Sequence, residues 1–246
     1  KLEDNPSHAY FPGGEKTSEY RESIYVGYRY YDKAGVDVRF PFGFGISYTK
    51  FAYRDLQLTR QGEDIAAKVT VKNVGDVAGA EVVQWYVGQK SPSIFKPVRE
   101  LKGFSKVFLQ PGEEKELTVT LPPRAFSYYH VAKADWCVET GAYIIEAAAS
   151  SRDIRCAAEI TLAGELPGDC LQSGAYERPV APLRIPDHDF EALYGHPLPL
   201  ANRQPGEVYT ADSTLGQIAQ TRTGAALLEQ MQQQMAGMLG GNGSPD

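Results

Sequence analysis

The chain has 246 residues, a formal net charge of −6 and a pI near 5.4, and 42% of its residues are hydrophobic. This composition is typical of a globular protein with one large domain or two smaller ones. The acidic balance and the lack of any lysine–arginine run argue against nucleic acid or an anionic membrane as partner. No apolar run approaches the roughly 20 residues of a membrane span.

Residues 1–48 have the pattern of the end of a preceding domain. The opening KLEDNPSHAYFPGG resembles the interior of a longer polypeptide, because it has neither an initiator Met nor a signal peptide. From Thr17 or Ser18 to Asp32 the spacing predicts a helix that Ser18 would cap. We expect its aromatic face to need an absent domain for burial. That face would carry Tyr20, Ile24, Tyr28 and Tyr31.

Residues 49–163 carry the clearest fold signal, because apolar and polar residues alternate in short runs separated by turn residues. About seven such runs in roughly 110 residues predict a two-sheet β-sandwich, with one face of each strand inward and the other toward water. The predicted inward residues are Ile65, Ala67, Val69 and Val71; Val83, Trp85 and Val87; Leu117, Val119 and Leu121; Tyr143, Ile145 and Ala147; and Cys156, Ala158, Ile160 and Leu162.

The connections and the tryptophans support the same fold. Residues 73–75 (Asn-Val-Gly) suit a turn, and Pro111-Gly112 suits a type II turn, in which proline fixes φ and glycine takes a positive φ. Trp85 and Trp136 are predicted to anchor the core.

Residues 164–246 are predicted to form an extended and partly helical C-terminal arm. The prolines between 167 and 186 favour an extended stretch, and a short helix is expected over residues 189–194. Thr214 and Gln217 have the spacing of a capping box, followed by a helical pattern with a break near Gly224. The last residues, GGNGSPD, are expected to be disordered.

The cysteines and histidines give no pattern of a metal site. Cys137, Cys156 and Cys170 are predicted to be free thiols, although a Cys137–Cys156 bridge stays open, and this thin usage favours a reducing compartment such as the cytoplasm. The histidines lack metal-ligand spacing and are expected on the surface or in loops. They are His8, His130, His188 and His196.

Two stretches carry a family resemblance. YRESIYVGYRYYDKAGVDVRFPFGFGISYTKF (20–51) resembles the segment that closes the α/β-sandwich domain of glycoside hydrolase family 3, apart from Ser23 where glycine is usual. VKNVGDVAGAEVVQWYVG (71–88), RELKGFSKVFLQPGEEKELTVTL (99–121) and DWCVETGAYIIEAAASS (135–151) resemble its fibronectin type III-like domain. Together with residues 5–51 these stretches cover about two fifths of the chain.

The resemblance implies a mainly β fold of the fibronectin type III or immunoglobulin-like kind, preceded by the end of an α/β-sandwich domain. It implies the C-terminal part of a retaining β-glucosidase that needs no cofactor and no metal. Its partners would be the barrel and α/β-sandwich domains of the same enzyme, its glucoside or oligosaccharide substrate, and a second copy. The family's nucleophile and acid/base lie upstream of this chain, so no catalytic residue is assigned and the chain alone is expected to be inactive.

Acidic residues in the first predicted helix are interpreted as structural. Glu22 occupies a family motif position and is expected to pair with Arg21 or Arg29, and Arg29 could also pair with Asp32 at i, i+3 spacing. Gly43-Phe-Gly45 indicates a tight connection in which side chains would obstruct packing.

The loop QKSPSIFKPV (89–98) is the candidate binding element, because long loops on a rigid sandwich often carry binding residues. Phe95 and Lys96 are its candidate substrate-binding residues, at the rim of the active site or at a neighbouring subunit. Two alternatives stay open. The chain could be a free-standing interaction or carbohydrate-binding module without catalysis, or its family member could cleave β-xylosides or N-acetylglucosaminides.

Overall fold

The computed structural model describes residues 1–13, 17–166, 174–198, 214–219 and 222–239, and the chain divides into two compact units. The first unit contains residues 1–9 and 21–193. The second contains residues 10–20 and 194–246. Each unit is described by itself below.

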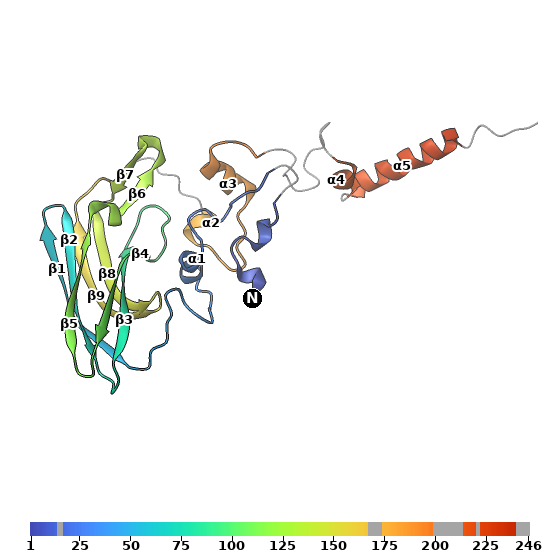
Figure 1. The fold of residues 1–246 in the computed structure, drawn as a ribbon. Coiled ribbons are helices and arrows are strands. Elements are labelled where there is room, and N and C mark those ends of the chain that lie inside the picture. The colour runs from blue at the N-terminus through green and yellow to red at the C-terminus, as the bar shows by residue number, and fades with distance from the viewer. Residues whose placement is uncertain (14–16, 167–173, 199–213, 220–221, 240–246) are drawn as a thin grey trace, which may run out of the picture. The chain divides into compact units, whose positions relative to one another are not determined.

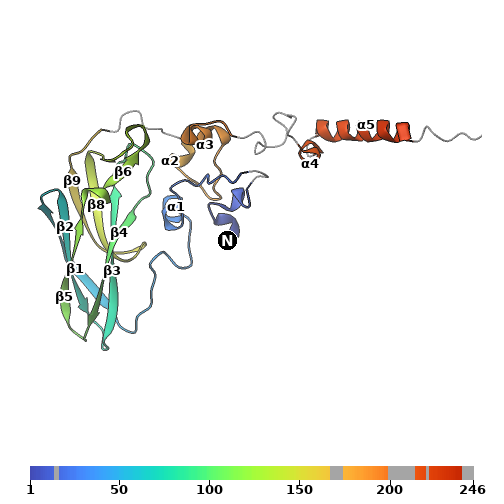
Figure 2. The same ribbon diagram turned by 45° about the horizontal axis from the view of Figure 1, so that its top comes forward.

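A β-sandwich dominates the first unit (Figures 1 and 2). One sheet has the strand order β1-β2-β5 and the other has the order β4-β3-β8-β9, with every neighbouring pair antiparallel. These seven strands in two sheets confirm the predicted fold class. The strands are β1 (Phe51–Gln61), β2 (Asp64–Asn73), β3 (Gly79–Gln89), β4 (Glu100–Leu109), β5 (Glu114–Leu121), β8 (Gly141–Ser150) and β9 (Asp153–Leu162).

The sandwich core follows the predicted alternation. Trp85, Val83 and Val87 of β3 face Ile65, Val69 and their neighbours of β2 across the two sheets, and all are buried. The inward residues of β5 and β9 are less enclosed, because β9 and the outer end of β5 lie at the margins of the core. Leu117, Val119, Cys156 and Ile160 are accordingly only partly buried against the cluster.

Trp136 is not a core anchor, contrary to the prediction. It lies in a separate two-stranded sheet of β6 (Ser127–His130) and β7 (Asp135–Val138), which follows the 3₁₀ turn Pro123–Ala125 and encloses another at Val131–Lys133. Trp136 is 43% exposed and the Arg124 guanidinium lies 3.3 Å from its ring centroid. A hairpin inserted between β5 and β8 moves this residue away from the sandwich. His130, at the end of β6, is buried rather than on the surface, with its ring beside Tyr128.

The strands β3 and β8 depart from the expected pattern, in which one face of each strand packs on the core and the other faces solvent. Gln84, Tyr86 and Ala148 point away from the sandwich core, yet they are 6%, 0% and 0% exposed. The reason is tertiary: residues 28–43 cover the outer face of these two strands, as detailed below. A period-2 pattern therefore identified the strands but not this second buried face.

The two predicted turns are present. Glu113 donates its backbone N–H to the Gln110 carbonyl at 3.0 Å, and Gly112 has φ +76°, as a type II turn requires. The turn after β2 is held by Asn73, whose side-chain oxygen accepts from the Gly75 N–H at 3.1 Å.

Residues 21–48, called the aromatic segment below, do not form the long helix that was predicted. They form a turn over residues 21–24 and one short helix, α1 (Tyr28–Lys33), preceded in the chain by 3₁₀ turns at Leu2–Asp4 and His8–Tyr10. Ser23 (φ 52°) and Gly27 (φ 58°) have positive φ angles, which interrupt a right-handed helix.

The buried aromatic residues of this segment are also different from the predicted ones. Tyr25 and Tyr30 are fully buried, whereas Ile24 is 38% exposed. Tyr25 and Tyr30, which the predicted face did not include, find their partners within this chain. Tyr20 and Ile24 of the predicted face stay exposed, so whether that face meets another domain stays a prediction.

Residues 174–193 complete the first unit. They contain α2 (Gly174–Glu177), an extended stretch through Pro179, Pro182 and Pro186 as predicted, and α3, which spans Asp187–Tyr194. Leu183 and Ile185 of the extended stretch are buried, which makes it part of the packed unit.

In the second unit, α4 (Leu215–Ala219) begins one residue after the predicted cap Thr214, and α5 spans Arg222–Leu239. The two helices confirm an interrupted helical pattern, but the predicted break at Gly224 is wrong, because Gly224 lies inside α5. The predicted disorder of residues 240–246 lies outside the described residues. None of the helices in the described ranges combines the length and hydropathy that a bilayer crossing requires.

Cys137 is buried and Cys156 is partly buried, and both are free thiols, so the bridge between them that the sequence left open does not form. Cys170 lies outside the described residues.

Candidate functional site

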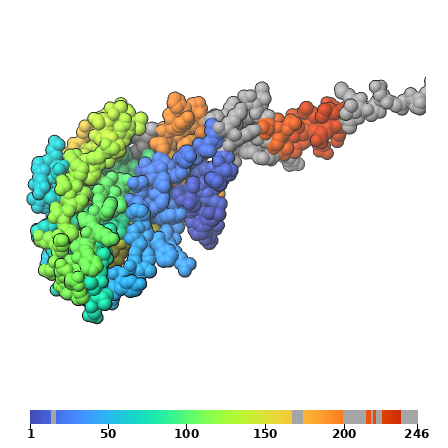
Figure 3. Space-filling model, viewed as in Figure 1, coloured from blue at the N-terminus to red at the C-terminus, as the bar shows by residue number. Residues whose placement is uncertain are grey.

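The candidate functional site is the junction between the aromatic segment and the outer face of β3 and β8, called the sheet–segment junction below. In Figure 3 this segment lies directly against β3 and β4. Tyr28 stacks on Phe42, with ring centroids 4.6 Å apart, and meets Tyr86 of β3 edge-on at 6.1 Å. The Tyr28 hydroxyl accepts the Leu101 N–H at 2.9 Å, and burial raises the pKa of Tyr28. One ring thus joins the segment to two strands.

Gln84 is the polar centre of the junction. Its Nε2 donates to the carbonyls of Gly43 at 2.9 Å and Ala149 at 2.8 Å, and its Oε1 accepts from the Tyr86 hydroxyl at 2.7 Å. A Cβ at Gly43 would overlap the Gln84 amide, and Gly43 has φ +77°. The tight connection predicted at Gly43 is confirmed, whereas a Cβ at Gly45 would meet nothing within 4 Å.

Arginines fix both ends of α1 to the sandwich. Arg152, in the β8–β9 turn, donates to Asp32 at 2.7 Å and to the Val36 carbonyl at 2.7 Å. Arg29 pairs with Glu100 at 3.2 Å. The predicted Arg29–Asp32 pair is therefore wrong, because each residue has a partner on the sandwich instead of on its own helix.

A second set of contacts joins the aromatic segment to residues 174–193. Tyr25 donates its hydroxyl to the Tyr176 carbonyl at 2.5 Å, and Tyr176 donates its own to the Arg21 carbonyl at 2.9 Å. Arg21, buried, donates to Asp187 at 2.6 Å and to the Ile185 carbonyl at 2.9 Å. The predicted Arg21–Glu22 pair is therefore also wrong, since Arg21 binds Asp187.

The predicted binding loop lies between β3 and β4, and its two candidate residues contact side chains outside the loop. Phe95 stacks on Tyr176 with centroids 5.1 Å apart and lies 6.2 Å from the Tyr25 ring. Lys96 donates to Gln89 at 2.5 Å and has its amine 3.6 Å from the Glu139 carboxylate. Burial lowers the pKa of the Lys96 amine, and Glu139 opposes that shift.

An open groove of about 1020 Å³ lies beside the sheet–segment junction. Its walls are residues 41–47 of the aromatic segment, Phe104 of β4, and the charged residues Arg152, Asp153 and Arg155. These charges are already paired: Arg155 makes two hydrogen bonds to Asp153, at 2.6 and 2.7 Å. The groove presents aromatic side chains, and Arg152, Asp153 and Arg155 on its wall have partners within the chain.

Sequence reasoning missed Gln84, Arg152 and Tyr176. A polar residue at the outward position of a strand normally faces solvent, so the sequence did not indicate that Gln84 is buried. Arg152 and Tyr176 act on residues more than a hundred positions away, which local patterns do not reveal.

Comparison with known proteins identifies the domain family of the sandwich. Residues 81–151 match the fibronectin type III-like domain family. The chain is 51% identical over 158 residues to thermostable β-glucosidase B of Acetivibrio thermocellus, covering 63% of this chain and 21% of that protein. It is 43% identical over 165 residues to an exo-α-(1→6)-L-arabinopyranosidase of Bifidobacterium breve, covering 67% of this chain and 22% of that protein.

Solved structures agree. The family 3 (GH3) β-glucosidase of Bifidobacterium adolescentis superposes with a TM-score of 0.65 at 34% identity, covering 93% of this chain and 28% of that protein. β-Glucosidase 3B of Thermotoga neapolitana, in complex with α-D-glucose, gives a TM-score of 0.61 at 38% identity, covering 67% of this chain and 24% of that protein. The chain is the C-terminal portion of a glycoside hydrolase family 3 enzyme, including its fibronectin type III-like domain. It spans about a fifth of the length of the curated relatives that it matches.

Proposed function

We propose that the chain is the non-catalytic portion of a retaining, exo-acting β-glucosidase that removes glucose from the non-reducing ends of β-glucosides. The β-glucosidases among its relatives support this activity, and the arabinopyranosidase among them makes the sugar worth testing directly. The two carboxyl groups of a retaining mechanism would belong to the remainder of the longer polypeptide. No metal or organic cofactor would be needed.

The observation that carries the architectural role is the sheet–segment junction. Residues that lead into the sandwich are tied to its outer face by Gln84, Tyr28 and Arg152. A connection held at several points would fix the sandwich relative to whatever precedes it. The loop after α1 exposes apolar side chains suited to contact with a larger body. They are Phe40, Phe44, Ile46 and Tyr48.

We propose three functional divisions for the longer enzyme. Residues 1–48 would close the α/β-sandwich domain, residues 49–163 would form the fibronectin type III-like sandwich, and residues 164–246 would form the C-terminal arm. The B. adolescentis structure covers 93% of this chain, a share that must include much of the arm, which supports an arm as a feature of such enzymes.

The activity is tested by comparing the purified chain with the longer polypeptide on aryl β-glucoside, β-xyloside, N-acetyl-β-glucosaminide and α-L-arabinopyranoside. We expect the longer polypeptide to prefer the β-glucoside and the chain alone to be inactive. Hydrolysis by the purified chain that is abolished by a substitution within it would overturn the non-catalytic role. Intact-mass analysis of the native sample would show whether a longer chain or a second chain is present.

We also propose that the loop around Phe95 and Lys96 contributes to oligosaccharide binding or to contact with a second copy. Its support is its length on a rigid sandwich and the firm anchoring of Phe95 and Lys96, which would hold the rest of the loop in place. Phe95→Ala in the longer enzyme should raise KM for an oligosaccharide or change the oligomeric state. Unchanged kinetics and an unchanged oligomeric state would contradict it.

A further inference from the structure

Glu22, in the turn before α1, is a buried acid with one unsatisfied carboxylate oxygen. It is 9% exposed, and its Oε2 has no hydrogen-bond partner. Within the described part of the chain its carboxylate makes no ion pair, because the two nearby arginines bind elsewhere. Arg21 pairs with Asp187 and Arg29 pairs with Glu100.

Such a group is unfavourable where it stands. Buried charges in proteins are normally paired or hydrogen-bonded, since removing an ion from water is costly. The backbone around Glu22 is fixed, because the Arg21 carbonyl accepts from Tyr176 and the Glu22 carbonyl accepts the Tyr25 N–H at 2.9 Å. The backbone therefore cannot readily carry the carboxylate out to solvent, and a cation from elsewhere would remove the penalty.

The neighbouring residues have the character of an interface. Ile24 is 38% exposed and Val26 is 55% exposed, while Tyr25 between them points inward and is fully buried. A desolvated charge with exposed apolar side chains close by in the chain is the composition found where protein surfaces meet. About four-fifths of the length of the relatives lies outside the region that this chain matches. The largest available source of a partner is therefore the rest of the same polypeptide.

We propose that Glu22, with Ile24 and Val26 beside it, is a docking contact that binds an arginine or lysine of the catalytic portion of the same enzyme. This inference rests on the proposed function and names the part of the chain through which the two portions meet. It predicts opposite effects of one substitution in two settings. In the purified chain the partner is absent, so Glu22→Gln removes an unpaired buried charge and should leave stability unchanged or raise it. In the longer enzyme it removes a paired charge and should lower stability.

The test compares Glu22→Gln and Glu22→Lys in the chain and in the longer enzyme by thermal unfolding. Glu116→Gln and Glu116→Lys are the matched controls, because Glu116 is an acid on the exposed face of the other sheet, with its side chain 61% exposed. In the longer enzyme we expect Glu22→Lys to lower the melting temperature by roughly 2–4 °C or more. Limited proteolysis between the portions should also be faster. The Glu116 variants should lose no more than the small contribution of the exposed Lys68–Glu116 pair and should be cleaved at the parent's rate.

Three results would overturn the inference. Equal behaviour of the Glu22 and Glu116 variants in the longer enzyme would show that Glu22 has no partner there. Destabilisation of the purified chain by Glu22→Gln would place the partner of Glu22 within this chain. A changed sedimentation coefficient of the purified chain on Glu22→Lys would assign the contact to a second copy. Glucosidase activity of the unsubstituted longer polypeptide tests the proposed function separately, so the two proposals can fail independently.

Discussion

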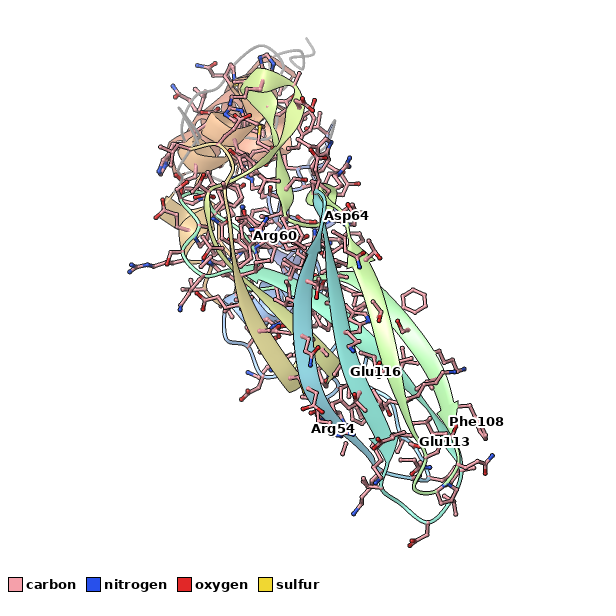
Figure 4. The ribbon with its side chains drawn as sticks, turned by 90° about the vertical axis from the view of Figure 1, so that its left-hand side faces the viewer. Arg54, Arg60, Asp64, Phe108, Glu113 and Glu116 are labelled. Atoms are coloured by element: carbon pink, nitrogen blue, oxygen red, sulfur yellow. The ribbon has the colours of Figure 1, made fainter. Side chains whose placement is uncertain are left out.

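The outer faces of the two sheets differ in burial, although apolar and polar residues alternate in the same way along the strands of both sheets. The face of β1-β2-β5, seen in Figure 4 with Arg54 and Glu116, carries charged residues. Arg54 pairs with Glu114 and Lys68 with Glu116, both at 2.9 Å and largely in solvent. On β3 and β8 the corresponding face is buried beneath the aromatic segment.

The difference shows how the sandwich is used. Exposed ion pairs contribute little to stability and tolerate change, which suits a surface that only meets water. Tyr86 and Gln84 are fully enclosed and bonded, which suits a surface that holds another part of the protein. At Gln84, Tyr86 and Ala148 the central strands β3 and β8 are therefore buried on both sides, whereas Phe104 and Phe108 of the neighbouring β4 are exposed.

The largest expected effect tests the core that both sheets share. Trp85→Ala should destabilise the purified chain by about 3–5 kcal/mol, because Trp85 is fully buried between the sheets. Trp136→Ala is the matched control and should cost far less, since that ring is 43% exposed. Urea unfolding followed by circular dichroism measures both. Similar losses for the two tryptophans would mean that the β6–β7 hairpin belongs to the same cooperative core.

The next effect tests the covered face through its backbone. Gly43→Ala introduces a Cβ that overlaps the Gln84 amide at a positive φ, so it should cost about 2–4 kcal/mol from crowding and backbone strain together. Gly45→Ala, two residues away in open space, should be nearly neutral. Urea unfolding of both variants gives the two free energies. If they cost the same, the junction does not constrain the loop.

A smaller effect separates the two faces directly. Gln84→Ala leaves the Gly43 and Ala149 carbonyls and the Tyr86 hydroxyl without their partner, and should cost about 1–3 kcal/mol. Lys68→Ala on the opposite sheet removes only an exposed ion pair and should cost less than about 1 kcal/mol. The Gln84 effect should persist in high salt, whereas the Lys68 effect should fade. A Gln84 loss that also fades with salt would contradict the burial argument.

Local patterns were sufficient for the sandwich and insufficient for what covers it. The alternation through Val83, Trp85 and Val87 correctly predicted the inward face of β3, because strand geometry fixes it. The same alternation predicted that Gln84 faces solvent. The sequence of β3 contains no sign that Gly43, about forty residues earlier, packs against Gln84. In the aromatic segment, helical spacing selected Tyr20 and Ile24, but the fold buries Tyr25 instead.

That error has a physical cause. A helix through residues 18–32 would leave Tyr25 on another face, whereas positive φ angles at Ser23 and Gly27 let Tyr25 reach Tyr176. Tertiary packing here outweighs intrinsic propensity, which amounts to less than about 1 kcal/mol per residue for most residue types. The resemblance to a known family was the strongest part of the sequence-based interpretation, because it draws on many residues at once.

The smallest predicted effect concerns Glu81 of β3, which shares the inward face of that strand with Val83 and accepts a hydrogen bond from Tyr53 of the other sheet. Partial burial raises the pKa of its carboxyl above the ordinary 4.5, against the Tyr53 hydroxyl that donates to it at 3.0 Å. A raised pKa in the folded state means that the unfolded chain loses this proton first as the pH rises. The contribution of Glu81 to stability is therefore full below about pH 4.5 and is lost as the pH rises through the folded pKa.

Glu81→Gln keeps the acceptor for Tyr53 and removes the titration. The variant should gain stability relative to the parent as the pH rises from 4.5 toward neutrality, and the difference should then level off. Melting temperatures of both proteins across pH 4–8 give this difference, in which all other titrating groups cancel. Glu114→Gln on the open face, where the side chain is 46% exposed, is the control for a surface carboxylate. A parent-to-variant difference that does not change with pH would mean that the inward position of Glu81 between the two sheets is as well solvated as the open face of β1-β2-β5, and the contrast between inward and outward positions would then end at this residue.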